Sequence, residues 1–263
     1  MTITKELADA ELFLFDMDGT VYIMDKEIEG SFDTIRALRK AGKRICFFTN
    51  NSSRAAEDYI EKLARMGLEI TRDEIYTSGE VTCEYISRKY PGKSVFVMGN
   101  AKLRDEFTRH GIPLSEDNPD LCVLGFDTEL EYYKLYRFCK QLNKGLPYIA
   151  THPDLNCPAE ECPMPDIGGM ILFIEATMGR TPDIIMGKPE KEAGDGVKRK
   201  FNLPADKIVM VGDRLYTDIA FGYNNGFRTA LVLSGETTAE MVAKEERQPT
   251  VVLPKVENIF VDE

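Results

Sequence analysis

The sequence predicts an α/β fold in which a doubly wound parallel sheet forms a core and a second α/β domain is inserted into it. Short apolar runs of strand length alternate with longer amphipathic segments in the first and last parts of the chain, as in βαβ units. The segment between them is bracketed by Pro91-Gly92 and Gly179-Arg180-Thr181-Pro182, which are typical of linkers. We therefore expect a discontinuous core of residues 1–91 and 184–263, with an inserted domain at 92–183.

The individual elements follow from the spacing of apolar residues and from glycines such as Gly42 and Gly67, which end helices. In the core, the pattern predicts strands at 12–15, 44–49, 74–77, 183–186, 207–211 and 229–233, and helices at 32–41, 55–66 and 79–90. In the inserted domain, it predicts strands at 94–98, 121–124 and 147–150, and helices at 102–110, 129–142 and 169–178.

Composition and charge exclude several classes of function. The formal net charge is −11, from 33 basic and 44 acidic residues, and no dense basic block is present, which argues against nucleic-acid binding. No apolar run is long enough to span a bilayer, and residues 1–6 lack the features of a signal peptide, so we expect a cytoplasmic protein. The six scattered cysteines are expected to be reduced, and Cys157 and Cys162 have no second pair nearby to complete a zinc site.

The most informative stretch is Asp16-Met17-Asp18-Gly19-Thr20, which directly follows an apolar strand. Residues two apart on a strand point to the same side, so the two carboxylates should converge and require a cation. An ordinary acidic turn is one alternative. An EF-hand calcium loop is another, but it needs Gly at its sixth position, where this chain has Val21.

Further polar residues follow the other predicted core strands, and an open parallel sheet binds ligands beyond the carboxyl ends of its strands. Thr49 and the N–H groups of an adjacent helix N-terminus can hold phosphoryl oxygens. Lys188 supplies a positive charge, and Asp213 supplies a third carboxylate for a hard ion such as Mg²⁺. Asp218 can orient a water or Lys188. Taken singly, each is also an ordinary cap, turn or surface residue, but their joint occurrence after four strands favours a site.

These residues resemble the haloacid dehalogenase-like (HAD) superfamily. Its four motifs match, in order, Asp16-Met17-Asp18-Gly19-Thr20, Thr49-Asn50, Lys188, and Gly212-Asp213 through Asp218. The inserted domain resembles the type 2 cap of that superfamily, on a Rossmann-like core. The stretches 48–52, 150–154 and 187–189 resemble the NagD-like and p-nitrophenyl phosphatase branch.

The resemblance implies that Asp16 attacks phosphorus to form an aspartyl phosphate, while Asp18 protonates the leaving alcohol and then activates water. It also implies that Mg²⁺ is held by Asp16, the main-chain carbonyl of Asp18, and Asp213. Thr49 and Asn50 would bind the phosphate, with Lys188 beside it. The implied protein is a Mg²⁺-dependent phosphatase of small phosphomonoesters, such as sugar phosphates, nucleotides or p-nitrophenyl phosphate.

Two alternatives remain open at this point. A phosphotransferase or phosphomutase of the same superfamily shares the acid at Asp18, but mutases usually carry a cap soon after the first motif, and here only a short stretch follows Thr20. A non-catalytic protein that binds a phospholigand is the other alternative, although nucleophile, acid and lysine are all present.

The inserted domain offers less specific candidates. His152, one of two histidines, stands where this branch often has Asn, and we consider both a local hydrogen bond and a substrate contact for it. Asp154 is a second candidate for cap specificity, and Arg214 can reach the substrate or form a surface ion pair. The tyrosine-rich helix at 132–138 is expected to pack in the core of the cap, with a homodimer contact as the alternative. The small-molecule substrate itself is left open.

Overall fold

The computed structural model describes residues 2–261, which form two compact units. Unit 1 comprises the described residues up to Phe48, Tyr59–Tyr76 and the described residues from Lys188 onward. Unit 2 comprises Thr49–Asp58 and Thr77–Gly187. The two units alternate along the chain because the polypeptide leaves unit 1 twice, at the ends of β5 and β6.

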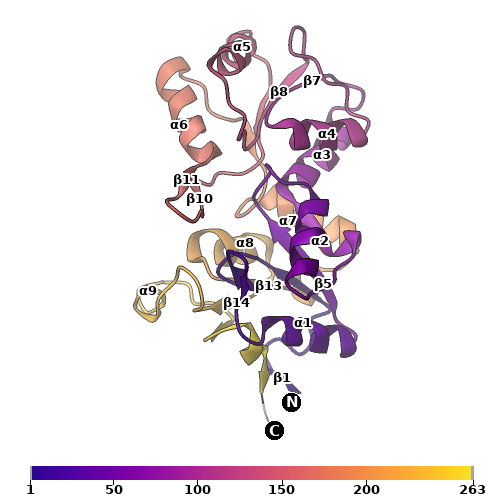
Figure 1. Cartoon of the computed structure of the whole chain (residues 1–263), viewed down its shortest axis with the longest axis vertical. Coiled ribbons are helices and arrows are strands. Elements are labelled where there is room, and N and C mark those ends of the chain that lie inside the picture. The colour runs from indigo at the N-terminus through magenta and orange to yellow at the C-terminus, as the bar shows by residue number, and fades with distance from the viewer. Residues whose placement is uncertain (1, 262–263) are drawn as a thin grey trace. The chain divides into compact units, whose positions relative to one another are not determined.

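Unit 1 is built around a six-stranded sheet with the order β15-β14-β13-β2-β5-β6. Figure 1 labels β5, β13 and β14 of this sheet. Strands β2 and β13 lie in the middle of this sheet and are completely buried, as expected for parallel strands covered on both faces. The strands are β2 (Leu12–Phe15), β5 (Arg44–Thr49), β6 (Ile75–Thr77), β13 (Ile208–Gly212), β14 (Arg228–Val232) and β15 (Val251–Leu253). The carboxyl ends of β2 and β13 therefore lie side by side.

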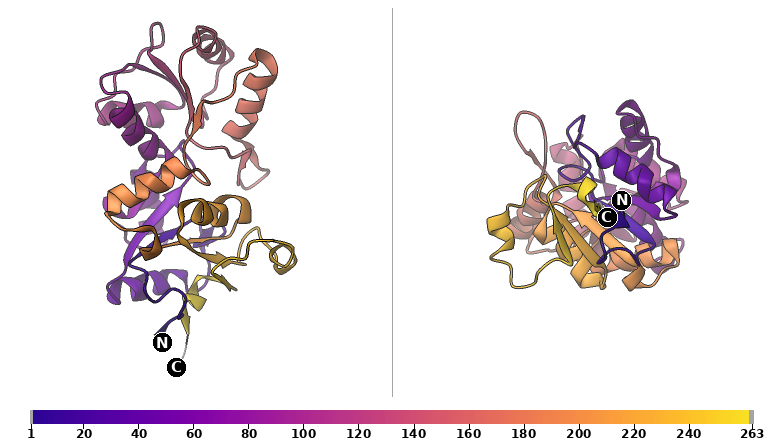
Figure 2. Two further views of the ribbon diagram at one scale, coloured as in Figure 1. Left: turned by 180° about the vertical axis from the view of Figure 1, so that it is seen from behind. Right: turned by 90° about the horizontal axis from the view of Figure 1, so that it is seen from below.

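The helices that belong wholly or partly to unit 1 are α1 (Ser31–Lys40), α2 (Ala56–Arg65), α7 (Lys191–Phe201), α8 (Ala220–Asn225) and α9 (Ala239–Val242), with short turns η1 (Arg72–Glu74), η2 (Ala205–Lys207), η3 (Leu215–Ile219) and η4 (Val256–Ile259). Two small antiparallel pairs complete the unit: β3 (Tyr22–Ile23) with β4 (Lys26–Glu27), and β1 (Thr2–Ile3) with β16 (Phe260–Val261). The latter pair brings the two described ends of the chain side by side (Figure 2).

Unit 2 contains a second parallel sheet with the order β12-β9-β8-β7. Its strands are β7 (Val95–Met98), β8 (Leu121–Leu124), β9 (Tyr148–Ala150) and β12 (Ile184–Ile185), and a hairpin pairs β10 (Asn156–Cys157) with β11 (Met164–Pro165). The helices are α3 (Ser78–Lys89), α4 (Ala101–Arg109), α5 (Tyr132–Leu142) and α6 (Ile167–Met178). A cluster around Phe96, Phe138 and Tyr148 forms the apolar core of this unit.

The predicted α/β class, with a doubly wound parallel sheet and an additional α/β unit, is confirmed. One strand was assigned to the wrong sheet: residues 184–185 form β12, which pairs with β9 of unit 2 rather than with a core strand. The prediction was wrong because apolar periodicity identifies a strand but not its partner. Helix α3 also groups with unit 2, where it packs against α4. The predicted boundaries at 91–92 and 183–184 stay a prediction.

No helix within residues 2–261 combines the length and the hydropathy that a bilayer-spanning segment requires.

The pairing of α7 with α8 depends on a glycine. A Cβ placed on Gly194 would lie 1.9 Å from Asn225 Oδ1, and Asn225 also donates to the carbonyl of Phe221 at 2.9 Å. Gly194→Ala should therefore lower the free energy of unfolding by about 1–3 kcal/mol, although alanine by itself favours a helix by roughly 1 kcal/mol. Urea denaturation measures this change.

The matched control is Gly169→Ala on α6, where the nearest atom to an added Cβ is the carbonyl oxygen of Leu155 at 4.0 Å. This variant should be as stable as the original protein or more stable. Equal effects of the two substitutions would contradict the role of close packing at Gly194.

Candidate active site

Asp16 is the first residue after β2, and the sheet fixes its main chain. Its N–H donates to the carbonyl of Val211 in β13 at 2.9 Å, which extends the β2–β13 ladder by one residue. Its Oδ1 accepts from Lys188 Nζ at 2.5 Å, and 18% of the side chain is exposed. Asp16 is thus a partly accessible carboxylate on a rigid strand end.

Lys188 lies inside unit 1 and bridges two carboxylates. Besides Asp16, its Nζ donates to Asp218 Oδ1 at 2.7 Å and to the carbonyl of Phe48 at 3.1 Å. Burial alone would lower the pKa of Lys188, but the charges of Asp16 and Asp218 outweigh it and the pKa is raised. Lys188 is therefore a permanent, almost completely buried cation, and not the solvated turn residue that its sequence context also allowed.

Asp218 is 1% exposed, and both of its oxygens accept hydrogen bonds. Oδ1 accepts from Lys188, and Oδ2 accepts from the N–H of Arg214 at 3.1 Å. It lies in η3, a π-helical turn, and a Cβ on Gly212 would lie 2.3 Å from its Cβ. These contacts give Asp218 the orienting position toward Lys188 that the sequence suggested, and they rule out a surface role.

Asp213 follows β13 and is 2% exposed. Its Oδ2 accepts from the N–H of Glu236 at 2.7 Å. Glycines surround the side chain: a Cβ would come within 2.5 Å of Asp213 Oδ2 at Gly19, where φ is +83°, and within 2.0 Å at Gly235. The close approach of these two main-chain segments to the carboxylate explains why glycine is present at both positions.

Asp16, Asp213 and Asp218 each place an oxygen within 4.8 Å of the others. Burial and the neighbouring charge of Asp16 raise the pKa of Asp213 to about 6, because a second negative charge is poorly stabilised there. A divalent cation would relieve this repulsion, and carboxylate oxygens are the ligands that Mg²⁺ prefers. Asp218 is the most deeply engaged of the three, since it is 1% exposed and each of its oxygens accepts from Lys188 or Arg214, whereas 18% of the Asp16 side chain is exposed.

Asp18 lies in the loop after β2 and not on the strand. Its Oδ1 accepts from the N–H of Met24 at 3.2 Å, next to the β3–β4 hairpin. The period of two that predicted its convergence with Asp16 ends at Phe15, the last residue of β2. Among the described residues, the carboxylates that gather with Asp16 are Asp213 and Asp218.

Arg214 carries a second positive charge near the carboxylates. Burial lowers the pKa of Arg214, but the negative charges of Asp16 and other neighbouring acids raise it by more, so the pKa lies above its ordinary value. Its Nε lies 3.0 Å from Glu236 Oε2, which also accepts from the hydroxyl of Tyr216 at 3.1 Å. The ion pair expected as its ordinary role is present, with 18% of the arginine side chain exposed.

Sequence reasoning missed the loop Ser234–Glu236. Ser234 Oγ donates to the carbonyl of Gly19 at 2.8 Å, and Glu236 contacts both Asp213 and Arg214. The loop follows β14, so the rule that polar residues at strand ends mark a site applies to it as well. The polar sequence Ser-Gly-Glu directly after a predicted strand could therefore have identified this loop as part of the site.

Thr49 and Asn50 belong to unit 2, in the loop that follows β5. Thr49 Oγ1 accepts from the N–H of Asn51 at 3.1 Å, so the hydroxyl hydrogen of Thr49 points away from that bond and can be donated. Asn50 Nδ2 donates to Asp154 Oδ1 at 3.0 Å. The helix predicted at 55–66 is α2, which begins at Ala56, so its N-terminus lies at the far end of this loop from Thr49.

His152 is fully buried in unit 2, and both ring nitrogens have partners. Nδ1 lies 3.0 Å from Thr151 Oγ1, and Nε2 lies 3.0 Å from Asp166 Oδ1. These bonds agree with the local hydrogen-bonding role considered for it. A direct contact of His152 or Asp154 with substrate stays a prediction.

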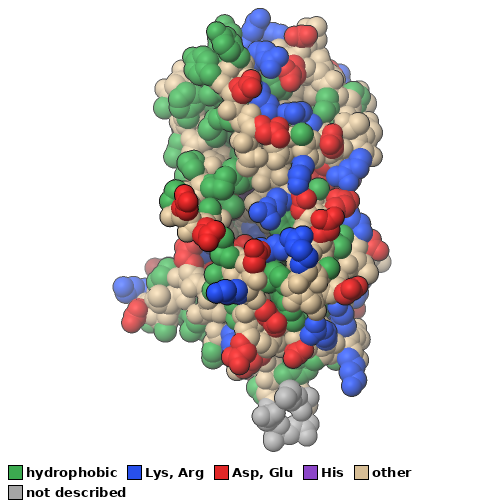
Figure 3. Space-filling model, in the orientation of Figure 1, with side chains coloured by type: hydrophobic (Ala, Val, Ile, Leu, Met, Phe, Trp, Pro, Cys, Tyr) green, Lys and Arg blue, Asp and Glu red, His purple; other side chains and the backbone are tan. Residues whose placement is uncertain are grey.

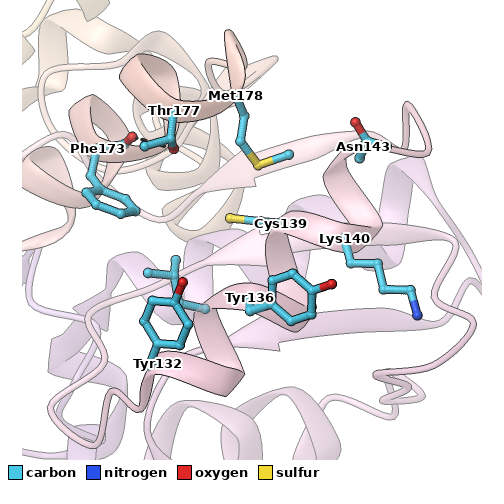
Figure 4. A pocket seen from close by; sticks show the side chains of 9 residues that line it. Tyr132, Tyr136, Cys139, Lys140, Asn143, Phe173, Thr177 and Met178 are labelled. Carbon is cyan, nitrogen blue, oxygen red and sulfur yellow. Dashed lines mark hydrogen bonds between the residues drawn. The ribbon is translucent and has the colours of Figure 1, made fainter.

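A groove of about 400 Å³ lies between α5 and α6, and apolar side chains gather over these helices (Figures 3 and 4). Leu135, Phe138 and Leu142 form the buried stripe of α5, whereas Tyr132 and Tyr133 are 74% and 75% exposed. Core packing of this helix is confirmed for Phe138, but the expectation was wrong for Tyr132, Tyr133 and Tyr136, which are exposed. Figure 4 shows Tyr132 and Tyr136 at the groove with Phe173.

The close packing around Asp213 yields a test of the metal site. Gly235→Ala should displace the Asp213 carboxylate, since Gly235 is not among the residues with positive φ and the added methyl group is its main perturbation. We expect Mg²⁺ affinity to fall by roughly tenfold, as for disturbed metal supports in general. Isothermal titration calorimetry measures this, and unchanged affinity would contradict the proposed crowding.

His152 yields a pH prediction. Burial lowers its pKa, but the charge and hydrogen bond of Asp166, together with Asp154, raise it above the ordinary value of 6.5. A raised pKa in the folded state stabilises the protein below pH 6.5, and this contribution disappears as the pH rises through the folded pKa. The stability difference between the original protein and His152→Gln, measured by denaturation, should therefore shrink from pH 5.5 to pH 8.5. A constant difference would show that His152 does not titrate.

Known proteins resemble the chain over almost its whole length. Models of the haloacid dehalogenase-like hydrolases match residues 13–113 and 185–259. An acid sugar phosphatase of Staphylococcus haemolyticus is 33% identical over 239 residues, which cover 90% of each sequence. A 4-nitrophenylphosphatase of Thermotoga maritima is 44% identical with a TM-score of 0.93, covering 96% of this chain and 97% of that chain.

A glycerol phosphate phosphatase of Mycobacterium tuberculosis, solved in complex with magnesium, is 25% identical with a TM-score of 0.91 and covers 99% of this chain and 79% of that chain. The predicted resemblance, including the p-nitrophenyl phosphatase branch, is confirmed. The chain belongs to the haloacid dehalogenase-like hydrolase family.

Proposed function

We propose that this member of the family is a Mg²⁺-dependent phosphatase that hydrolyses small phosphomonoesters through an aspartyl-phosphate intermediate. The observation that carries the proposal is the partly exposed carboxylate of Asp16, held by the buried Lys188 within 4.8 Å of Asp213 and Asp218. The phosphatase relatives support the same reaction class.

Mg²⁺ fits the residues of this site. Asp16 and Asp213 would hold it with their carboxylates and Asp18 with its main-chain carbonyl, and the pKa of Asp213, which burial and the charge of Asp16 raise to about 6, supports this proposal. When bound, the ion neutralises charge on the phosphoryl oxygens and polarises phosphorus toward attack. A relative of known structure binds magnesium.

Asp16 is the proposed nucleophile. A carboxylate oxygen attacks phosphorus, the bond from phosphorus to the alcohol oxygen breaks, and the carboxyl group of Asp18 gives its proton to that oxygen. Lys188 orients Asp16, because its ammonium donates a hydrogen bond to Oδ1. This arrangement supplies positioning and charge neutralisation, which are the main requirements of phosphoryl transfer.

The second half of the reaction regenerates the enzyme. The carboxylate of Asp18 takes a proton from water as the water oxygen attacks phosphorus, and the bond from phosphorus to Asp16 breaks. Inorganic phosphate leaves, and Asp18 is again protonated for the next cycle. The bond from the N–H of Met24 to Asp18 Oδ1 restricts the rotation of this side chain in its loop.

Thr49, Asn50 and Arg214 are proposed to bind the phosphoryl group. Thr49 has a hydroxyl hydrogen to donate, and Asn50 an amide fixed by Asp154. Arg214 contributes a guanidinium whose Nε is held by Glu236. Asp218 acts behind Lys188 by orienting it.

The cap is proposed to select the alcohol part of the substrate. His152 and Asp154 would influence this choice, and Asp154 also holds Asn50, which is proposed to bind the phosphoryl group. Sugar phosphates and p-nitrophenyl phosphate fit the reaction equally well.

We further propose a homodimer and a cytoplasmic location. The exposed tyrosines of α5 support the first proposal, since large aromatic side chains are enriched at protein interfaces. The six cysteines, all within the described residues, are thiols, which suits a reducing compartment.

Incubation with p-nitrophenyl phosphate and Mg²⁺ tests the function. The protein should release phosphate, chelation of the metal should stop the release, and Asp16→Asn should lower kcat by roughly a thousandfold or more, because the nucleophile is lost. Asp33→Asn is the matched control, since Asp33 is 85% exposed on α1 and pairs with Arg36.

The control variant should retain full activity. Absence of phosphate release, or full activity of Asp16→Asn, would contradict the mechanism. Binding of inorganic phosphate without turnover would instead favour a non-catalytic phospholigand-binding protein.

A further inference from the structure

The loop Thr49–Ser53 is fixed within unit 2 by side chains from several distant segments. Ser78 Oγ donates to the carbonyl of Asn50 at 2.5 Å, and Asn100 Nδ2 donates to the carbonyl of Ser53 at 2.8 Å. These bonds hold the main chain at two points. Side chains of this loop are also bonded to other segments: the N–H of Phe126 donates to Ser52 Oγ at 2.9 Å, Asn51 Nδ2 donates to Cys157 Sγ at 3.5 Å, and two further bonds come from residues 151–154.

One of these bonds begins a buried relay. Ser52 Oγ lies 2.9 Å from Thr151 Oγ1, Thr151 Oγ1 lies 3.0 Å from His152 Nδ1, and His152 Nε2 lies 3.0 Å from Asp166 Oδ1. None of the four side chains is more than 3% exposed. The relay therefore connects the loop after β5 to the first turn of α6 without contact with solvent.

The directions of these hydrogen bonds follow from the chemistry of each group. Asp166 Oδ1 also accepts from the N–H of Ile167 at 2.6 Å, so His152 must carry a hydrogen on Nε2 to bond with the carboxylate. In the neutral imidazole Nδ1 then accepts from the hydroxyl of Thr151, and Thr151 Oγ1 accepts from the hydroxyl of Ser52. In this arrangement each of the three bonds of the relay pairs one donor with one acceptor, so the hydroxyl groups of Ser52 and Thr151 each have a fixed rotation.

The second bond lies two residues further along. Asp154 Oδ1 accepts from Asn50 Nδ2, so the segment 151–154 holds Ser52 and Asn50 together. Gly187 closes this cluster: a Cβ there would lie 2.6 Å from Asn50 Oδ1 and 2.9 Å from the carbonyl oxygen of Thr151. Gly187 is thus in close contact with both the loop that contains Asn50 and the segment that contains Thr151, which leaves little room for either segment to shift alone.

A buried histidine in such a relay needs an explanation. Apolar side chains of similar volume would fill the site without the cost of desolvating an imidazole and a carboxylate. Fully satisfied buried networks instead impose one geometry on the groups they connect. The last side chain of this relay is Ser52, which is three residues from Thr49 and whose Oγ also accepts from the N–H of Phe126 at 2.9 Å.

We propose that His152 and Asp166 are positioning residues that fix, through Thr151 and Ser52, the loop whose Thr49 and Asn50 bind the phosphoryl group of the substrate. This inference rests on the proposed function, because it takes the phosphate-binding role of Thr49 and Asn50 from there. It gives His152 an indirect role in substrate affinity.

Thr151→Val tests the relay, because valine keeps the shape of threonine and removes the hydroxyl that joins Ser52 to His152. With p-nitrophenyl phosphate, we expect KM to rise roughly tenfold and kcat to change by less than about threefold, as when binding is lost equally in ground and transition states. The inhibition constant of inorganic phosphate should rise by the same factor as KM.

Thr177→Val is the matched control in the same unit. The hydroxyl of Thr177 donates to the carbonyl of Phe173 at 2.8 Å on α6, at an exposed position. Its KM and phosphate inhibition constant should equal those of the original protein. A merely structural role of the relay would lower the melting temperature of Thr151→Val but leave both constants unchanged.

If Thr151→Val does not fold, Ser52→Ala breaks the same link, with Ser94→Ala as its control, since Ser94 bonds to Asp120 at 3.0 Å. KM and phosphate inhibition constants within twofold of the original values in a folded variant would overturn the proposal. Failure of the proposed function is distinguishable, because the original protein would then release no phosphate. If it binds phosphate without turnover, the dissociation constant measured by calorimetry tests the relay in the same way.

Discussion

The site depends on one buried ion pair network, in which Lys188 bridges Asp16 and Asp218. Removing one partner of a buried charge pair typically costs about 3–5 kcal/mol, because the remaining charge has lost both its partner and its water. Lys188 therefore holds together the end of β2 and the turn η3, and at the same time it orients the carboxylate of Asp16, the proposed nucleophile. The ion pairs of Lys188 with Asp16 and Asp218 therefore matter both for the stability of unit 1 and for the proposed chemistry of Asp16.

The acidic residues create a charge imbalance that only a cation can correct. Asp16, Asp213 and Asp218 gather within 4.8 Å, and among the side chains described near them Lys188 and Arg214 supply the positive charges. The pKa of Asp213 is raised because the carboxylate is buried and is repelled by the negative charge of Asp16. Glycines at positions 19 and 235 permit the main chain to approach this carboxylate closely, so the surroundings of Asp213 are built from backbone as much as from side chains.

Unit 2 contributes a second rigid element. The loop after β5 leaves the six-stranded sheet and is bonded by Ser78, Asn100, Asp154 and Thr151, all residues of unit 2. Thr49–Asp58 accordingly belong to unit 2. Thr49 and Asn50 thus pack with unit 2, although β5, the strand that leads into them, packs with unit 1 up to Phe48.

The sequence by itself determined the α/β class, most element positions and the residue types of the site. It did so because apolar periodicity and strand-end polarity are local properties, visible for Asp16, Lys188 and Asp213 without knowledge of their neighbours. Only the tertiary structure decided that β12 pairs with β9, that Asp18 does not gather with the other carboxylates, that Glu236 supports Asp213, and that His152 is buried between Thr151 and Asp166. Strand partners, hydrogen-bond partners and burial depend on contacts between distant segments, which a single sequence does not encode in any local pattern.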